Sequence, residues 1–175
     1  MNVKSGFTLI EVLVSVGIIA LVGIVLSQGF FSMVRTNVMT ELIKDVKQNG
    51  DVALDVMTRM VRNASAVTTV CSDSGTTTGS ITIQNPNSYT TTFQCVLDSG
   101  VARIASVSAV KTEYLTSRNV ALGVDCTNAL TFVCTSLPVQ KIGIKISFRL
   151  GQTGNSPDQF ERVSDVFQAT VTTRQ

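Results

Sequence analysis

Residues 6 to 34 read GFTLIEVLVSVGIIALVGIVLSQGFFSMV, which is the only long apolar stretch of the chain. From Val12 to Val34 there is no charged residue. As an α-helix that rises about 1.5 Å per residue, this uncharged segment would be roughly 34 Å long, which is enough to cross a bilayer. The stretch therefore predicts a membrane-spanning helix near the N-terminus.

A single carboxylate, that of Glu11, lies at the start of this apolar segment. An ionisable group deep in a bilayer costs about 2.5 to 3.5 kcal/mol on insertion scales, and less near the interface. The natural use of such a group is to meet a positive partner. An ordinary secretory signal peptide has an apolar core of about 7 to 15 residues with its cleavage site after the core, so the longer run here does not fit one. A plain signal anchor would explain the length and the apolarity, but not an acid at this place.

A short leader that ends in Gly6, followed by FTLIEVLVSVGIIALVGIVL, resembles the class 3 signal of type IV prepilins. This family includes type IV pilins, minor pilins, and the pseudopilins of type II secretion and competence systems. The resemblance is strong over residues 1 to 34, about a fifth of the chain. It implies that prepilin peptidase cleaves between Gly6 and Phe7, and that Phe7 becomes the N-methylated first residue. It also implies that Glu11 neutralises the N-terminal ammonium of a neighbouring subunit in a filament.

The resemblance also implies a division of the chain and a location. Residues 1–6 would be the leader, 7–36 a transmembrane and filament-core helix, 37–65 its amphipathic second half, and 66–175 a β-rich globular head. The partners would be prepilin peptidase, other pilin or pseudopilin subunits, and an inner-membrane assembly platform. The protein would cross the cytoplasmic membrane once with its head outside the cytoplasm, and would join a periplasmic or extracellular filament after assembly. The family's frequent helix-kinking proline is missing, since the first proline is Pro86.

Composition points away from catalysis and from dedicated nucleic-acid binding. The net charge is +2 and only 15% of residues are charged, so nothing resembles the strongly basic face of a nucleic-acid binder, and nucleic acid is left open as a partner without being indicated. Histidine, the commonest general base and metal ligand, does not occur in the sequence. Neither a Gly-x-Ser-x-Gly motif nor a P-loop is found, and nothing marks a Ser/Lys dyad. We therefore expect no enzyme and no cofactor.

The four cysteines all lie beyond the apolar segment, at Cys71, Cys95, Cys126 and Cys134. None belongs to a Cys-x-x-Cys pair, so zinc or iron–sulfur spacing is absent. Disulfides would fit an oxidising compartment outside the cytoplasmic membrane. Of the three pairings that exist, Cys71–Cys95 with Cys126–Cys134 is favoured because each closes a loop that is local in sequence. Buried free thiols are the alternative.

The apolar helix is expected to continue past the membrane as an amphipathic helix that ends near residues 63–65. Its apolar positions recur at helical spacing, while Asn49-Gly50 interrupts the pattern and could bend the helix. The apolar positions are Leu42, Val46, Leu54, Met57, Val61 and Ala64.

The remaining sequence is β-rich. The clearest alternation places Ile142, Ile144, Ile146 and Phe148 on one face of a strand over residues 141–150, with 166–171 as its antiparallel neighbour. Other expected strands are 66–70, 80–84, 90–96, 101–106, 109–115, 130–135 and 162–174. A long helix laid on an antiparallel β-sheet is an α+β fold of the pilin type.

Several loop residues were considered as ligand sites. Asp73, Asp98, Asp125 and Asp158 have Asn, Ser or Gly neighbours, and isolated solvated turn acids are favoured over a calcium site because no EF-hand-like array occurs. We therefore expect no metal. Tyr89 and Phe93 are interpreted as strand-face core residues rather than as part of an exposed contact surface.

Two functions follow from these patterns. Segment 57–64, MTRMVRNA, with the short strands and the final long pair that follow, resembles minor pseudopilins of the J/W type. The first function is a structural filament subunit, as a minor pilin or pseudopilin. The alternative is a tip-located binding module that contacts DNA, surfaces or a secreted substrate through the polar loops 72–79 and 151–159. A membrane-anchored enzyme is the least favoured interpretation.

Overall fold

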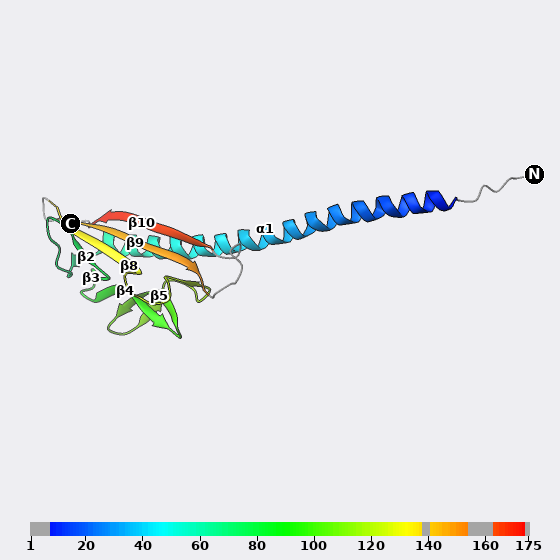
Figure 1. Ribbon diagram of the computed structural model, residues 1–175. Helices are drawn as coiled ribbons and strands as arrows, with labels where there is room; N and C mark the ends of the chain where they lie inside the picture. Colours follow the sequence, from blue (N-terminus) through cyan, green and yellow to red (C-terminus); the bar gives the residue numbers. More distant parts are fainter. Residues whose placement is uncertain (1–7, 138–140, 154–162, 174–175) are drawn as a thin grey trace, which may run out of the picture. The chain divides into compact units, whose positions relative to one another are not determined.

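The computed structural model describes residues 8–137, 141–153 and 163–173. Gly6 and Phe7, and with them the expected cleavage site, lie outside the described residues, as do Asp158 and most of the loop 151–159. One helix, α1 (Leu9–Asn63), begins just after Thr8 and is followed by strands of different lengths (Figure 1). The chain forms two compact units, Met1–Thr40 and Glu41–Gln175, which are taken in turn.

The first unit, in its described part, consists of the beginning of α1. Its residues from Leu9 onward are helical, and their apolar side chains are exposed around the helix. The second unit contains the rest of α1 and all the strands.

In the second unit, one face of α1 is buried. The buried positions repeat at intervals of three and four residues, as expected for a helix that packs along one stripe. They are Val46, Gly50, Ala53, Met57 and Val61 within α1, followed by Ala64 just after it. The predicted stripe is confirmed at Val46, Met57, Val61 and Ala64, whereas Leu42 and Leu54 are only partly buried.

The expected bend at Asn49-Gly50 is wrong, because α1 passes through both residues without a break. Gly50 is buried and lies against the ring of Phe167, so closely that a Cβ at this position would collide with the ring. The Asn49 side chain donates to the carbonyl of Asp45 at 2.9 Å and accepts from the amide of Ser117 at 2.8 Å. This dipeptide is therefore a close-packing point between the helix and the rest of the second unit.

The first sheet contains five antiparallel strands in the order β1-β3-β4-β5-β6. Strands β4 and β5 are joined by the two-residue turn Ser99-Gly100, whose φ angles are 53° and 84°. Positive φ at both residues is the requirement of a type I′ hairpin, and glycine meets it without strain. The strand bounds are β1 Ala66–Val67, β3 Ser80–Gln84, β4 Thr90–Asp98, β5 Val101–Ser108 and β6 Thr112–Tyr114.

The second sheet runs in the order β10-β9-β8-β2, with β7 also paired to β9. The predicted antiparallel partnership of the last two long strands is confirmed, with Phe148 opposite Phe167 and their rings stacked at 5.3 Å. The strand bounds are β2 Thr76–Thr78, β7 Val120–Ala121, β8 Leu130–Ser136, β9 Ile142–Gln152 and β10 Ser164–Thr172.

The predicted α+β class is confirmed: a long helix packs on antiparallel sheets, of which the head has two. Two short strands were not predicted. One is β7, and the other is β2, which lies inside the segment 72–79 that was interpreted as a polar loop. The expected strand 109–115 is shorter, because β6 begins only at Thr112.

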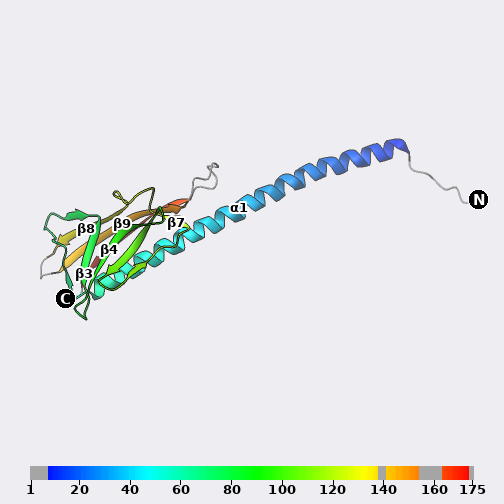
Figure 2. The same ribbon diagram turned by 90° about the horizontal axis from the view of Figure 1, so that it is seen from below.

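The core forms where the buried face of α1 meets side chains from both sheets, and the last turns of the helix lie along the strands (Figure 2). The predicted inner face of β9 is confirmed, since Ile144, Ile146 and Phe148 are buried. The largest side chains that are fully buried are Phe93, Phe132, Met57, Ile81, Ile83, Ile104, Leu130, Ile144, Ile146 and Leu150.

Candidate functional site

The start of α1 is held by reciprocal hydrogen bonds between Thr8 and Glu11. The Thr8 amide and hydroxyl each donate to the Glu11 carboxylate at 3.0 Å, and the Glu11 amide donates to the Thr8 hydroxyl at 3.4 Å. This arrangement is a capping box, which satisfies backbone donors that the first helical turn leaves unpaired. The Thr-x-x-Glu spacing before an apolar run signals such a helix start, and interpreting Glu11 only as a charge partner misses it.

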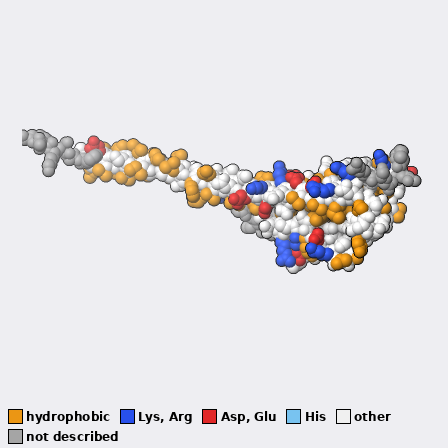
Figure 3. All heavy atoms as spheres, turned by 180° about the vertical axis from the view of Figure 1, so that it is seen from behind, with side chains coloured by type: hydrophobic (Ala, Val, Ile, Leu, Met, Phe, Trp, Pro, Cys, Tyr) orange, Lys and Arg blue, Asp and Glu red, His pale blue; other side chains and the backbone are white. Residues whose placement is uncertain are grey.

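The apolar segment from Leu9 to Val34 presents large hydrophobic side chains in all directions. Each of them is between 44% and 80% exposed in the single chain, and they cover the N-terminal part of the helix in Figure 3. The mean hydropathy reaches 2.8 over a window of this helix, so by length and composition α1 is able to cross a membrane. A helix that is apolar on every side requires lipid or other helices around it.

Three hydroxyl groups in and beside this segment donate to backbone carbonyls of the helix. Ser15 donates to the Glu11 carbonyl at 2.7 Å, Ser27 to the Gly23 carbonyl at 2.8 Å, and Thr36 to the Ser32 carbonyl at 2.9 Å. Such bonds to the fourth preceding carbonyl give these three hydroxyl protons an acceptor in an apolar environment. The serines at these positions are therefore compatible with lipid or with tightly packed helices.

The structure pairs the cysteines differently from the favoured prediction. Cys71 bonds Cys134 and Cys95 bonds Cys126, with Cα–Cα distances of 5.1 and 5.5 Å. The expected Cys71–Cys95 and Cys126–Cys134 bridges are wrong, because the pairing of strands, rather than closeness in sequence, decides which cysteines meet. Strand β2 places the segment after Cys71 beside Cys134, with Thr76 opposite that cysteine, whereas Cys95 lies in the other sheet.

A charged cluster fastens the tip of the β4–β5 hairpin to the segment that precedes β7. The Asp98 carboxylate binds Arg103 at 2.6 Å and Arg118 at 2.9 and 3.2 Å. Arg103, with a side chain only 11% exposed, also donates to the Thr116 carbonyl at 2.9 Å, and its guanidinium lies 4.1 Å from the centre of the Tyr114 ring. The hydrogen bonds from Arg118 and then from Arg103 lower the pKa of Asp98. The cluster holds these two segments of the head together. The expectation that Asp98 is an isolated solvated turn acid is therefore wrong.

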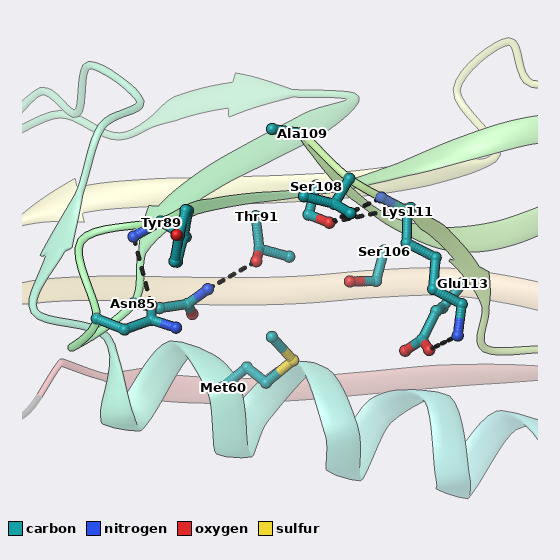
Figure 4. A pocket seen from close by; sticks show the side chains of 11 residues that line it. Met60, Asn85, Tyr89, Thr91, Ser106, Ser108, Ala109, Lys111 and Glu113 are labelled. Atoms are coloured by element: carbon teal, nitrogen blue, oxygen red, sulfur yellow. Dashed lines mark hydrogen bonds and ion pairs between the residues drawn. The ribbon is translucent and has the colours of Figure 1, made fainter.

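A polar hollow of about 360 Å³ lies beside the last turns of α1 (Figure 4). Met60 forms its base, and Asn85 donates to the Thr91 hydroxyl at 2.8 Å along its wall. Lys111 and Glu113 form an ion pair of 2.6 Å on the opposite side. These polar groups largely bond one another, so the hollow offers a small binding surface and no constellation of catalytic groups.

The other residues singled out in the sequence lie apart. The interpretation as a strand-face core residue is confirmed for Phe93, which is fully buried. It is wrong for Tyr89, which is exposed and lies just before β4, beside the hollow. Asp125 accepts from the Thr127 amide at 3.0 Å in a local turn, and Asp73 is exposed. Within the described ranges, no group of three or more acidic or cysteine side chains is placed to hold a metal ion.

Comparison with known protein families gives a match for the N-terminal segment. Residues 1–27 match the family model of the prokaryotic N-terminal methylation motif. Comparisons with curated proteins and with solved structures gave no match. A long apolar helix and antiparallel sheets follow this motif, an arrangement that is consistent with membrane anchoring of a pilin-type protein.

The match over residues 1–27 supports a type IV pilin-like protein. Proteins with this motif are processed by prepilin peptidase and assembled with other pilins. The motif family is structural rather than enzymatic.

Proposed function

We propose that this chain is a structural subunit of a type IV pilin-like filament. The observation that carries the proposal is the apolar surface of Leu9–Val34, which is exposed on all sides of the helix and overlaps the methylation motif matched over residues 1–27. In the membrane, lipid covers this surface. In a filament, the helices of neighbouring subunits cover it, and burial of apolar area at about 25 cal/mol per Å² makes this the main cohesive term.

Processing prepares the helix for assembly. Prepilin peptidase cleaves between Gly6 and Phe7 on the cytoplasmic side and methylates the Phe7 amine. The leader carries away Lys4, which lowers the net charge from +2 to +1. An inner-membrane assembly platform then extracts the subunit while the head stays outside the cytoplasm. The two disulfides support this location, since such bonds persist in oxidising compartments.

Glu11 sets the position of the subunit during assembly. Glu11 follows Phe7 by four residues in the sequence, and within a low-dielectric bundle its carboxylate would attract the Phe7 ammonium of the next subunit. The capping bonds from Thr8 leave acceptor capacity on the Glu11 carboxylate for this second partner, because an ionised carboxylate accepts about four hydrogen bonds.

The deciding experiment replaces Glu11 by Ala. The Glu11→Ala chain should still be cut and methylated, which intact-mass measurement of the mature protein would detect, but its incorporation into sheared filaments should be strongly reduced. Glu11→Asp is the matched control, because it keeps the charge. Normal incorporation of Glu11→Ala would contradict the role of Glu11, and a chain that keeps Met1 in cells would contradict the whole proposal.

The resemblance of residues 57–64 to J/W-type pseudopilins favours a minor pilin or pseudopilin of a secretion, competence or pilus system. Abundance distinguishes the cases, since a major subunit dominates sheared surface filaments and a minor one does not. The alternative, a tip-located binding module, has one favourable observation, the hollow beside Met60 with the exposed Tyr89. Tyr89→Ala with intact assembly but lost adhesion or DNA uptake would favour that alternative.

A further inference from the structure

The polar hollow beside Met60 is bordered by two tight turns of the first sheet. One turn, residues 85–89, joins β3 to β4, and the other, residues 108–111, joins β5 to β6. Both turns lie at the same end of the sheet, because these strands form successive antiparallel hairpins. The hollow has a volume of about 360 Å³, which lies in the range of about 300 to 1,000 Å³ that is typical of small-molecule sites.

The turn between β3 and β4 fixes the position of Tyr89. The Ser88 amide donates to the Asn85 carbonyl at 2.9 Å, and the Asn85 amide donates to the Tyr89 carbonyl at 2.8 Å. Ser88 has a φ of 68°, so the loop is a three-residue hairpin connection with a bulge, and glycine is the usual residue at this position. Pro86 restricts the same turn. A ligand therefore meets a backbone that is already ordered, which lowers the cost of binding.

Tyr89 presents its aromatic ring to the hollow. The residue is 64% exposed although it lines the hollow, and in Figure 4 it stands beside Asn85, with Ser106 on the side toward Lys111. A tyrosine ring offers a large amphipathic contact area. A single exposed aromatic residue is common on protein surfaces. Tyr89 differs because polar side chains that keep hydrogen-bonding capacity surround the same hollow.

Three side chains of the hollow supply that capacity. The Asn85 amide nitrogen donates to the Thr91 hydroxyl at 2.8 Å, which orients the amide and leaves its oxygen to accept. The Asn87 oxygen accepts from the Tyr89 amide at 3.3 Å, which leaves its NH₂ group to donate. In the part of the chain that the structure describes, no side-chain partner is found for the Ser106 hydroxyl, which both donates and accepts.

The hollow carries no net charge. Among the described residues that line it, the charged ones are Lys111 and Glu113, which form an ion pair of 2.6 Å. Nucleic acid draws much of its affinity from Lys and Arg side chains that neutralise phosphates, and this pair offers none in excess. An apolar ligand would leave the asparagine and serine groups without partners, at a cost in free energy. The lining is therefore best matched by a neutral ligand with many hydroxyl groups.

We propose that this hollow binds a neutral saccharide. The C–H face of a sugar ring packs on the Tyr89 ring, and its hydroxyl groups, each of which donates and accepts, pair with Asn85, Asn87 and Ser106. The inference deepens the alternative of a binding module, and it rests on that alternative rather than on assembly into a filament.

The position of the hollow within the second unit leaves it accessible. Met60 follows Glu41, the first residue of that unit, by nineteen residues, which is about 28 Å along the helix. The hollow thus lies at the end of the head that is remote from the start of the unit. A saccharide can reach it while lipid or other helices cover the apolar segment.

The first test uses the fluorescence of Tyr89, because the chain has two tyrosines and no tryptophan. Tyr114→Phe makes Tyr89 the only tyrosine and keeps the aromatic ring that lies against Arg103. This full chain, unassembled in phosphocholine micelles that contain no sugar head group, is titrated with glucose, galactose, N-acetylglucosamine and lactose. At least one of these sugars should change the emission in a saturable way. Saturation-transfer NMR should then show transfer from aromatic protons mainly to the ring C–H protons of that sugar.

The second test compares variants of the full chain by the same NMR measurement. Tyr89→Ala should raise the Kd for the sugar at least about tenfold, whereas Tyr89→Phe should stay near wild type because the ring remains. Ser106→Ala and Asn87→Ala should each raise the Kd about two- to tenfold, because each loses one hydrogen bond. Asn119→Ala, at an exposed asparagine outside the hollow, is the matched control for Asn87→Ala and should bind as wild type does. Thermal unfolding in the same micelles checks that every variant is folded.

Three results would overturn the saccharide site. The first is no saturable response to any of the four sugars up to about 50 mM, where even millimolar affinities saturate. The second is equal binding by Tyr89→Ala and wild type, since the sugar would then lie elsewhere. The third is a Tyr89 response to a thymidine oligonucleotide but to none of the sugars, which would indicate a nucleic-acid ligand.

These outcomes are separate from those of the filament experiment. The chain is unassembled during the titrations, so a failure to bind sugar leaves the filament subunit as proposed. Normal incorporation of Glu11→Ala into filaments would likewise leave the saccharide site unchanged.

Discussion

The two halves of α1 share one backbone and differ in what their side chains need. From Leu9 to Val34 the large apolar residues occur on every side and all are exposed in the single chain. From Val46 to Val61 they occupy one stripe, which the strands of the second unit cover. The two halves therefore pack against different neighbours although the helix is continuous. The spacing of the apolar residues along each half decides what covers it. The first half depends on neighbours that the chain does not contain, whereas the second half is stabilised by the chain's own core and disulfides.

Removal of the longer disulfide is expected to have the largest effect, a loss of stability confined to the second half of α1 and the head. Cys71 and Cys134 are 63 residues apart, so in the chain-entropy account their bond stabilises the head by about 4 kcal/mol. Cys71→Ser/Cys134→Ser should lower the free energy of unfolding of the head by about that amount. Thermal unfolding of the full chain in detergent would measure this loss, while the segment from Leu9 to Val34 should keep its helicity.

Removal of the shorter disulfide, Cys95–Cys126, should cause a slightly smaller loss of stability than removal of the longer one. Cys95 and Cys126 are 31 residues apart, so their removal should cost about 0.6 kcal/mol less than removal of the longer bridge. Loss of helicity in the N-terminal segment after either double substitution would contradict the independence of the two halves.

The next largest effect compares the same substitution at two glycines of α1. Alanine at Gly50 gains about 1 kcal/mol of helix propensity but collides with the buried Phe167 ring, and overpacking costs about 1 to 3 kcal/mol. We expect a net loss of about 1 kcal/mol in head stability. Gly23→Ala is the matched control, because a Cβ there meets nothing within 4 Å in the single chain.

Combining Gly50→Ala with Phe167→Leu tests the cause of that loss. A smaller side chain at residue 167 relieves the collision, so the two changes together should cost less than the sum of their separate effects. Strict additivity, or a Gly50→Ala chain as stable as Gly23→Ala, would show that the close approach is unimportant.

Much of this contrast could be predicted from periodicity. The apolar run from Val12 to Val34 and the alternation of Ile142 to Phe148 each require one kind of element, and the structure has both elements. The burial of Met57 and Val61 follows from the same reasoning. These predictions succeed because hydrophobic period is a local property of the sequence.

The features that could not be predicted depend on contacts between residues far apart in the sequence. Nothing near Cys71 indicates that β2 will pair with β8 and bring it to Cys134. The bend expected at Asn49-Gly50 does not form, and Phe167, the residue that packs against Gly50, lies more than a hundred residues later in the sequence. At the N-terminus, the roles of Gly6, Phe7 and Glu11 in processing and assembly stay predictions that come from the family resemblance.

A smaller effect is expected at the first turn of α1, where Thr8 caps the helix. Thr8→Val removes the hydroxyl that accepts from the Glu11 amide, and loss of such a cap costs about 1 kcal/mol. Amide hydrogen exchange of residues 9–12 in micelles should accelerate, while unfolding of the head stays the same. Thr40→Val is the control, since its hydroxyl only donates back to the Thr36 carbonyl, and equal acceleration there would contradict the capping role.

The smallest effect is a pH dependence confined to the head. The pKa of Asp98 lies below its ordinary value of about 3.9 because Arg118 and Arg103 bind its charged form. Its contribution to stability is therefore fully present above the unfolded pKa and is lost as pH falls through the lower folded pKa. In thermal unfolding of the full chain, Asp98→Asn should be less stable than wild type at pH 7, and the difference should shrink below about pH 4. Asp73→Asn, at an exposed position, should follow wild type throughout. A gap between Asp98→Asn and wild type that stays constant down to about pH 3 would mean that the arginines bind the Asp98 side chain without regard to its charge.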